Sequence, residues 1–346
     1  MGIFPGLAGN DGLKKRMDAA FVSGSSPAHA LIAEGPDGSG RHTFALQYAA
    51  ALSCEKRREY DGNSPLPCGK CRNCRKILSG ISPDVITVGN DDKASLGVDK
   101  IRDLRQDVHI FPNDLEHKVY IIEQADTMTV QAQNAFLLTL EEPPAYAVFI
   151  LLCRNSGALL ETVRSRAPVI RMQPLTRAQT EQVISGIMPE AGKIKASDPD
   201  KYAAALASAA GSAGRAVELL RSAEGDEAAQ LYTGVGTFIS LCHDKRMGAQ
   251  AMTELVRDCE NSREKSADFL KAVIAACRDL IALQKNSECE PVFFTDTAKA
   301  AGLSECFSAK KLLLICSAAE KAATAVSRGM NVRLTLMTML SESGII

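Results

Sequence analysis

The sequence predicts an α/β domain built on a parallel sheet, followed by a region made only of helices. From residue 28 to about residue 167, short apolar runs alternate with amphipathic stretches, and runs that are apolar on both faces are typical of a buried parallel sheet. After residue 176 the strand patterns nearly vanish, and alanine- and leucine-rich periodic segments take over. At 346 residues the chain is too long for one ordinary core, so we expect two or three domains.

Four apolar runs are the predicted strands, and amphipathic helices are predicted between them. We expect these helices to begin at Arg41, Asp99 and Val130 because each follows or opens a periodic apolar pattern. The predicted strands are residues 29–34, 84–88, 118–122 and 148–152.

The helical region opens at a capping signal. Thr176 precedes a helical pattern with an acidic residue in its first turns, which favours a helix start. We expect a loop around residues 193–200 and a break near Gly211. A second helical region should begin near Glu224 and run to the end of the chain.

Charge and hydropathy exclude several classes of protein. The net charge is −1, so the surface lacks the basic excess of a protein that holds DNA alone. We find no charged leader with a long apolar run, and no run of membrane-spanning length. A soluble, cytoplasmic protein without membrane contact is therefore expected. Eleven cysteines in such a chain favour reduced thiols and a metal site over disulfides.

A glycine-rich loop follows the first predicted strand. Its glycines are Gly35, Gly38 and Gly40, and a loop between a strand and a helix can wrap phosphates with backbone N–H groups. In the phosphate-loop pattern, however, the lysine position is Arg41 and the magnesium-ligating hydroxyl position is His42. Arginine is not a conservative replacement there. We expect ATP or ADP to bind weakly or not at all; the alternative is a glycine-rich turn without any ligand.

A second degenerate motif follows the third predicted strand. A phosphate-loop ATPase places there an aspartate that supports magnesium and a glutamate that activates water, whereas this chain has Glu123 and Gln124. An amide cannot accept a proton, so the general-base contribution of about 10²- to 10⁴-fold is absent. We therefore expect no hydrolysis at this chain's own site.

A cysteine cluster lies between the first two strands. Cys68, Cys71 and Cys74 are separated by two residues each, and Cys54 lies thirteen intervening residues before them. Four thiolates suit a closed, structural zinc site. An iron–sulfur cluster would need a further cysteine at position 78, which is leucine. Unligated or redox thiols are the remaining alternative, and His42 is the reserve ligand.

An arginine follows the last predicted strand on a short helical turn. This residue, Arg166, lies in Val163-Arg-Ser-Arg-Ala167. An arginine on such a turn at a subunit edge can reach a neighbour's γ-phosphate and stabilise the charge that develops in phosphoryl transfer. In isolation, an ordinary surface arginine is the simpler reading of this residue.

Together these motifs resemble the clamp-loader branch of the AAA+ family. The strongest match is residues 130–144, Val-Gln-Ala-Gln-Asn-Ala-Phe-Leu-Leu-Thr-Leu-Glu-Glu-Pro-Pro, and Ser165-Arg166 stands in place of the family's Ser-Arg-Cys motif. The family's sensor position falls at Cys153 or Arg154. The resemblance implies a RecA-like α/β domain over 1–175 with a zinc-binding insertion at 54–74, a helical lid over 176–222 and a helical collar domain over 223–346.

The resemblance also implies a role. A subunit with a degenerate ATP site and a retained Arg166 would supply that arginine in trans to a neighbour's ATP within a hetero-pentamer that loads a sliding clamp onto primed DNA. The collar contacts would come from residues 309–316 and the segment after Asn331. Two alternatives stay open: an ATP-hydrolysing subunit of the same family, and a zinc-dependent nucleic-acid-binding module that uses the basic residues Lys70, Arg72, Arg75 and Lys76.

Overall fold

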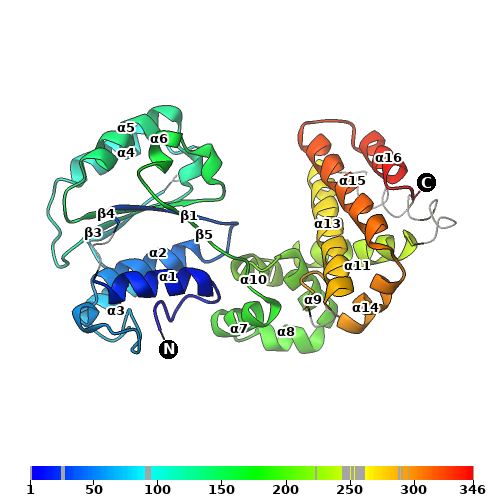
Figure 1. Cartoon of the computed structure of the whole chain (residues 1–346), viewed down its shortest axis with the longest axis horizontal. Helices are drawn as coiled ribbons and strands as arrows, with labels where there is room; N and C mark the ends of the chain where they lie inside the picture. The colour runs from blue at the N-terminus through cyan, green and yellow to red at the C-terminus, as the bar shows by residue number, and fades with distance from the viewer. Residues whose placement is uncertain are drawn as a thin grey trace. The chain divides into compact units, whose positions relative to one another are not determined.

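The computed structural model describes residues 2–345 except for 25–27, 90–94, 223, 244–249, 251–252, 254–261, 287–288, 290 and 295. The chain forms two compact units, Met1–Pro174 and Leu175–Ile346 (Figure 1). The first boundary of the predicted domains lies one residue away from this division. The further division of the second unit into lid and collar stays a prediction.

The first unit is the predicted α/β domain. Its five-stranded sheet has the order β2-β3-β4-β1-β5, and all four strand pairs are parallel. The strands are β1 (Ala30–Glu34), β2 (Val85–Val88), β3 (Lys118–Ile122), β4 (Ala147–Cys153) and β5 (Val169–Arg171). The first four confirm the predicted runs. The fifth, three residues that pair with β1, is too short to give a pattern in the sequence.

Helices cover both faces of the sheet, as Figure 1 shows. One face carries α1 (Asp11–Val22), α2 (Arg41–Leu52) and α3 (Arg72–Leu78), and the other carries α4 (Val98–Asp107), α5 (Val130–Glu141) and α6 (Glu161–Arg164). Helices α2 and α5 begin where predicted, and α4 begins one residue earlier. Short 3-10 turns, η1 (Arg57–Glu59), η2 (Ala125–Thr127) and η3 (Ser156–Ala158), complete the unit.

Two separate cores flank the sheet because successive strand residues point to opposite faces. In β1, Leu31 packs into the core under α2, whereas Ile32 packs into the core under α5. The same alternation runs along β4 from Val148 to Cys153. A strand buried on both faces reads as a continuous apolar run, which is why these strands are visible in the sequence.

The segments that carry the predicted site residues follow the carboxyl ends of β1, β3 and β4. The glycine-rich loop follows β1, Glu123 and Gln124 follow β3, and Arg154 follows β4. Because β4 is paired with both β1 and β3, these three strand ends lie side by side. Ligands of open parallel sheets bind at this edge.

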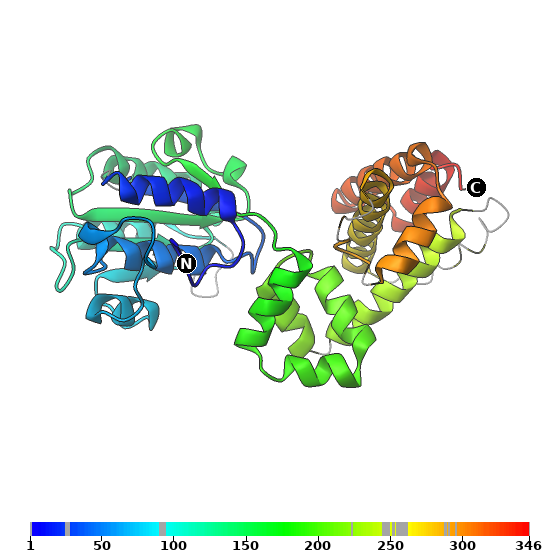
Figure 2. The ribbon, with the colours of Figure 1, turned by 60° about the horizontal axis from the view of Figure 1, so that its bottom comes forward.

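The second unit is helical over its described residues. The helices before residue 223 are α7 (Arg177–Ile187), α8 (Ala191–Ser197), α9 (Pro199–Ser208) and α10 (Ala213–Arg221), which form the group of green helices in Figure 2. They share a core of their own that includes Ile184, Tyr202 and Leu219. Thr176 caps α7 through a complete capping box with Gln179, so the predicted helix start is confirmed.

The predicted loop at residues 193–200 is wrong. Helix α8 ends at Ser197, and α9 begins at Pro199 after the single residue Asp198. Asp198 accepts a hydrogen bond from the backbone N–H of Lys201, and proline at the first helical position is compatible with a helix start. The polar composition that suggested a loop therefore belongs to the solvent side of two short helices.

The remaining helices share a larger core. They are α11 (Glu224–Leu241), α13 (Arg263–Lys285), α14 (Thr297–Glu305), α15 (Ala309–Ser327) and α16 (Val332–Glu342). Phe238, Phe269 and Ile315 are among its fully buried members. Among the helices of the described residues, none combines the length and the apolar character needed to cross a bilayer.

Candidate functional site

The glycine-rich loop joins β1 to α2, as the sequence predicts. Gly38 and Gly40 have φ angles of 70° and 89°, which glycine adopts far more readily than other residues. A Cβ at Gly35 would lie 2.8 Å from Ser39 Oγ and 2.9 Å from Met172 Cβ. Its backbone N–H donates to Cys153 O at 3.1 Å. The loop is thus tied to the end of β4 at a position where only glycine fits.

The cationic side chain of this loop is already paired within it. Arg41 opens α2, and its Nη2 lies 2.6 Å from Asp37 Oδ1. The Arg41 side chain is only 13% exposed, whereas that of Asp37 is 68% exposed. A phosphate that approached Arg41 would therefore meet a carboxylate of the same charge as itself.

The residues after β3 reach the same helix end. Glu123 Oε1 lies 3.0 Å from His42 Nδ1, so the structure brings together one residue from each of the two motifs that the sequence analysis singles out. Gln124 adopts the left-handed conformation, with φ 47°. His42 lies against Glu123, and the four thiols of the cysteine cluster already form a group of their own, so His42 is not needed as a ligand.

Arg154, after β4, forms ion pairs with residues that follow the two neighbouring strands. Arg154 Nη1 lies 3.7 Å from Asp37 Oδ2, and Arg154 Nε lies 3.5 Å from Asp126 Oδ2. The sequence patterns do not single out Asp37 or Asp126 as site residues, although both lie inside the motifs. The signal for them is their position: one is within the glycine-rich loop and the other two residues after Gln124.

Arg166 occupies a different part of the domain. It follows the short helix α6, and its side chain is 35% exposed. Nη2 lies 2.7 Å from Glu141 Oε1 at the end of α5, and Nη1 donates to the backbone oxygen of Thr162 at 2.9 Å. The guanidinium is thus held from two sides while it stays partly accessible to solvent.

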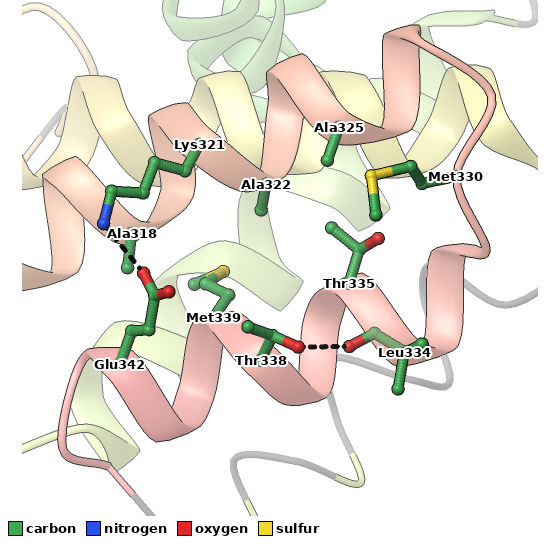
Figure 3. Close-up of a pocket in the computed structure, with 10 residues that line it drawn as sticks. All are labelled: Ala318, Lys321, Ala322, Ala325, Met330, Leu334, Thr335, Thr338, Met339 and Glu342. Atoms are coloured by element: carbon green, nitrogen blue, oxygen red, sulfur yellow. Dashed lines mark hydrogen bonds and ion pairs between the residues drawn. The ribbon is translucent and has the colours of Figure 1, made fainter.

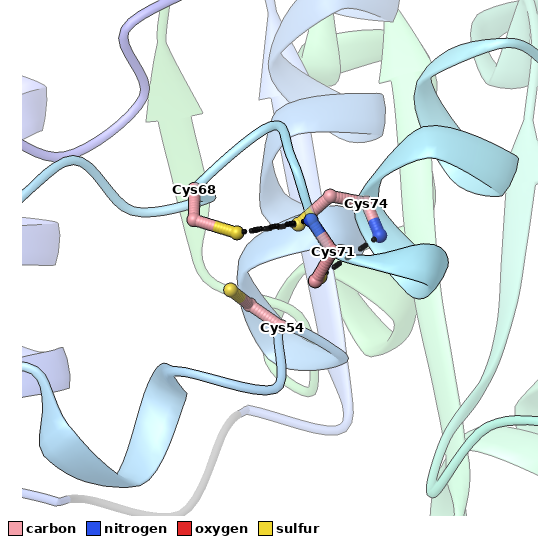
Figure 4. A group of neighbouring side chains, drawn as sticks. All are labelled: Cys54, Cys68, Cys71 and Cys74. Carbon is pink, nitrogen blue, oxygen red and sulfur yellow. Dashed lines mark hydrogen bonds between the residues drawn. The ribbon is translucent and has the colours of Figure 1, made fainter.

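The four cysteines of the predicted zinc site converge in space (Figure 4). The sulfur atoms of Cys54, Cys68, Cys71 and Cys74 all lie within 4.8 Å of one another. Cys54 lies two residues after the end of α2, Cys71 caps α3, and Cys74 lies within α3. Backbone N–H groups of Cys71 and Cys74 donate to the sulfurs of Cys68 and Cys71, both at 3.4 Å.

The thiols of the cluster shift one another's protonation. The pKa of Cys54 is lowered, chiefly because the Cys74 thiol donates a hydrogen bond to it. The pKa of Cys74 is raised by that same hydrogen bond and by burial. Four converging sulfurs fit the closed tetrahedral coordination of a structural zinc ion, which would hold α3 against the end of α2.

The predicted collar contacts lie on two adjacent helices of the second unit. Leu312 and Ile315 of α15 are buried in its core, whereas Leu313 and Leu314 are 58% and 45% exposed. A groove of about 150 Å³ runs between α15 and α16 (Figure 3), and Leu334 on its rim is 63% exposed. The collar role of these helices stays a prediction.

These features define a class of fold: an α/β domain with a parallel five-stranded sheet and a glycine-rich loop after β1, followed by a helical unit. Residues 11–176 match the protein family described as DNA polymerase III, delta subunit. The matched region is just under half of the chain.

Curated relatives agree with the family match. The chain is 34% identical over 148 residues to the DNA polymerase III subunit delta' of Bacillus subtilis, which covers 43% of each protein. It is 32% identical over 197 residues to the subunit tau of the same organism, covering 53% of this chain and 33% of that protein. The chain therefore spans less than half of the length of these relatives.

A solved structure aligns over nearly the whole chain. The gamma subunit-related protein of Thermotoga maritima is 19% identical, with 95% of this chain and 97% of that protein covered, at a TM-score of 0.37.

Proposed function

We propose that this chain is a non-hydrolysing subunit of the DNA polymerase III clamp loader. In this role it supplies Arg166 in trans to the ATP bound by a neighbouring subunit. The assembly, a hetero-pentamer, uses that ATP to load a sliding clamp onto primed DNA. The zinc ion has a structural role within the α/β domain.

The pairing of charges at the chain's own loop carries this proposal. Arg41 is bound to Asp37, and His42 is bound to Glu123, so both side chains that replace the catalytic lysine and hydroxyl already have partners within the chain. Gln124, in the position of the water-activating carboxylate, cannot take a proton. An own-site ATPase would need these contacts to break and would still lack its base.

The environment of Arg166 supports the other half of the proposal. Its side chain is partly exposed and anchored at the end of a short turn. A guanidinium carries five N–H donors, and its fork geometry suits phosphate oxygens. An arginine supplied in trans contributes about 10³- to 10⁵-fold to the rate of phosphoryl transfer in other nucleotide hydrolases.

The test is the ATPase activity of the reconstituted complex with Arg166→Ala. We expect DNA-stimulated turnover to fall by at least about 10²-fold, while assembly measured by size-exclusion chromatography is unchanged. Arg164→Ala is the matched control, because Arg164 is an exposed arginine two residues earlier. Equal turnover in the two variants would reject the proposal.

The chain alone provides the test against the hydrolysing alternative. We expect the purified chain with magnesium and ATP to show no turnover above background. Rapid turnover that Arg41→Ala abolishes would identify a self-sufficient ATPase instead.

A further inference from the structure

Helix α5 holds the amino end of the short turn, formed around α6, that carries Arg166. Gln133, only 2% exposed, accepts a hydrogen bond from the backbone N–H of Leu160 at 2.7 Å through Oε1. Its Nε2 donates to Met128 O at 3.1 Å and to Ala158 O at 3.4 Å. A buried amide that satisfies backbone groups of both segments sets the position of the turn that carries Arg166.

The same helix reaches the other end of the turn through Glu141. This carboxylate, the last residue of α5, lies 2.7 Å from Arg166 Nη2. The opposite side of the guanidinium is held by Thr162 O through Nη1 at 2.9 Å. Two contacts to different nitrogens define the plane of the guanidinium, whereas one contact would leave it free to rotate.

These contacts leave Arg166 able to bind an acceptor from outside the domain. A guanidinium has five N–H donors, and the two strongest contacts occupy only part of them. The Glu141 side chain is 45% exposed and that of Arg166 35% exposed, so an acceptor from outside the domain could reach the arginine while Glu141 stays bound. A free arginine side chain would instead lose its conformational freedom on each productive encounter.

We infer, on the basis of the proposed function, that Glu141 is a positioning residue for Arg166. It orients the guanidinium before a neighbouring nucleotide arrives, so the arginine meets the γ-phosphate in its productive geometry. The hydrogen-bond acceptor at this position matters more than its negative charge, because a charge beside the guanidinium weakens the field that the phosphate experiences.

Glu141 has one alternative role, which is inhibitory. In this role the carboxylate competes with phosphate for Arg166 and slows the reaction. Removal of its charge would then increase turnover. The two roles predict opposite signs for the same substitution.

The chain offers a matched control. Glu142 is the next residue, is exposed, and caps the same helix end. It has no ion pair with Arg166 among the contacts of the described residues. Glu142→Ala therefore removes an identical side chain from the same helix end without touching the guanidinium.

The experiment measures kcat and KM for ATP in the reconstituted complex, with DNA and clamp, for four variants of this chain. Glu141→Ala should lower kcat by roughly 3- to 30-fold with little change in KM, since an ordered arginine side chain avoids an entropy loss of that size. Glu141→Gln, whose amide oxygen can accept the same hydrogen bond, should stay within about threefold of the wild type. Glu142→Ala should be unchanged.

Arg166→Ala in the same preparations separates the two proposals. If Arg166→Ala leaves turnover intact, the proposed function fails. If it lowers turnover but Glu141→Ala does not, only the positioning role is overturned. Faster turnover in both Glu141 variants would establish the inhibitory role of Glu141 instead. Should Glu141→Ala prevent assembly, a fifth variant, Glu141→Met, removes the hydrogen-bond acceptor from a side chain of similar length. Lower turnover in Glu141→Met with turnover near the wild type in Glu141→Gln supports positioning, and equal turnover in these two variants overturns it.

Discussion

Arg41 and Asp37 form a 2.6 Å ion pair inside a single glycine-rich loop. The two residues are four positions apart, at opposite ends of the turn that leads into α2. Arg154 approaches the other oxygen of the same carboxylate at 3.7 Å. Asp37 therefore lies between the arginines that a phosphate would contact at this edge of the sheet.

Asp37→Asn should strengthen the binding of pyrophosphate to the purified chain. Removal of one like charge about 4 Å from the anion is worth about 1 kcal/mol in water, which corresponds to roughly fivefold in affinity. Isothermal titration calorimetry at low ionic strength measures the change, and added salt should reduce it.

The control for this substitution is Asp99→Asn. Asp99 also forms an exposed pair with an arginine on its own helix, Arg102, at 3.1 Å, but it is not part of the loop. Equal affinities in Asp37→Asn and the wild type would show that the carboxylate does not oppose anions.

Zinc removal should loosen the insertion between α2 and α3. We expect about one zinc ion per chain by metal analysis and a lower melting temperature of the first unit after chelation, because a structural zinc site contributes directly to folding free energy. Cys68→Ser should lose the metal. Cys306→Ser, at an exposed cysteine outside the cluster, should retain it. A full zinc complement in Cys68→Ser would contradict the four-cysteine site.

Asp84 should be a strong stabilising residue of the first unit. It is fully buried, and its two carboxylate oxygens accept hydrogen bonds from the backbone N–H groups of Asn113, Asp114 and Leu115. Asp84→Ala leaves these donors unpaired, and we expect a cost of about 2–4 kcal/mol.

Hydrogen exchange at amides 113–115 is the direct readout for Asp84. Exchange should accelerate in Asp84→Ala and stay slow in Asp103→Ala, an exposed aspartate on α4. Unchanged protection in both variants would mean that the loop is held by other contacts.

His117 should make the first unit less stable in mild acid. Its pKa is lowered by burial and by the nearby positive charge of Arg57, whose Nη1 lies 3.4 Å from His117 Nε2. The folded state thus prefers neutral His117. As pH falls through the ordinary histidine range towards the lowered folded pKa, the unfolded state takes up the proton first, and stability is lost.

The readout for His117 is the melting temperature of the first unit between about pH 8 and pH 5.5. His117→Gln should flatten the decline, whereas His109→Gln, at an exposed histidine, should not. A decline of equal steepness in His117→Gln and the wild type would rule out this contribution.

The strands and motifs of the first unit are visible in the sequence because their signals are local. A strand buried on both faces is a continuous apolar run, and the glycines of the loop and the spaced cysteines lie close together along the chain. Strand β5 escapes prediction because it has only three residues. Its pairing with β1 is supplied by the rest of the sheet.

The short helices around residues 193–200 are harder to predict from the sequence than the strands of the sheet. Residues 193–200 are polar enough to suggest a loop, yet Ala191 and Ile194 pack into the core shared by α7, α9 and α10. Tertiary packing decides such segments, because short helices gain most of their stability from contacts rather than from propensity.

The parallel α/β domain, the cysteine cluster, the glycine-rich loop and the candidate arginine can all be predicted from the amino-acid sequence, since each depends on residue type and on spacing along a few turns of chain. The ion pairs become visible only in the folded chain: Asp37 pairs with Arg41 and Arg154, Glu123 with His42, and Glu141 with Arg166. Ion pairs between strand ends and helix ends depend on distances of a few ångströms, and those distances are set by the packing of the whole sheet.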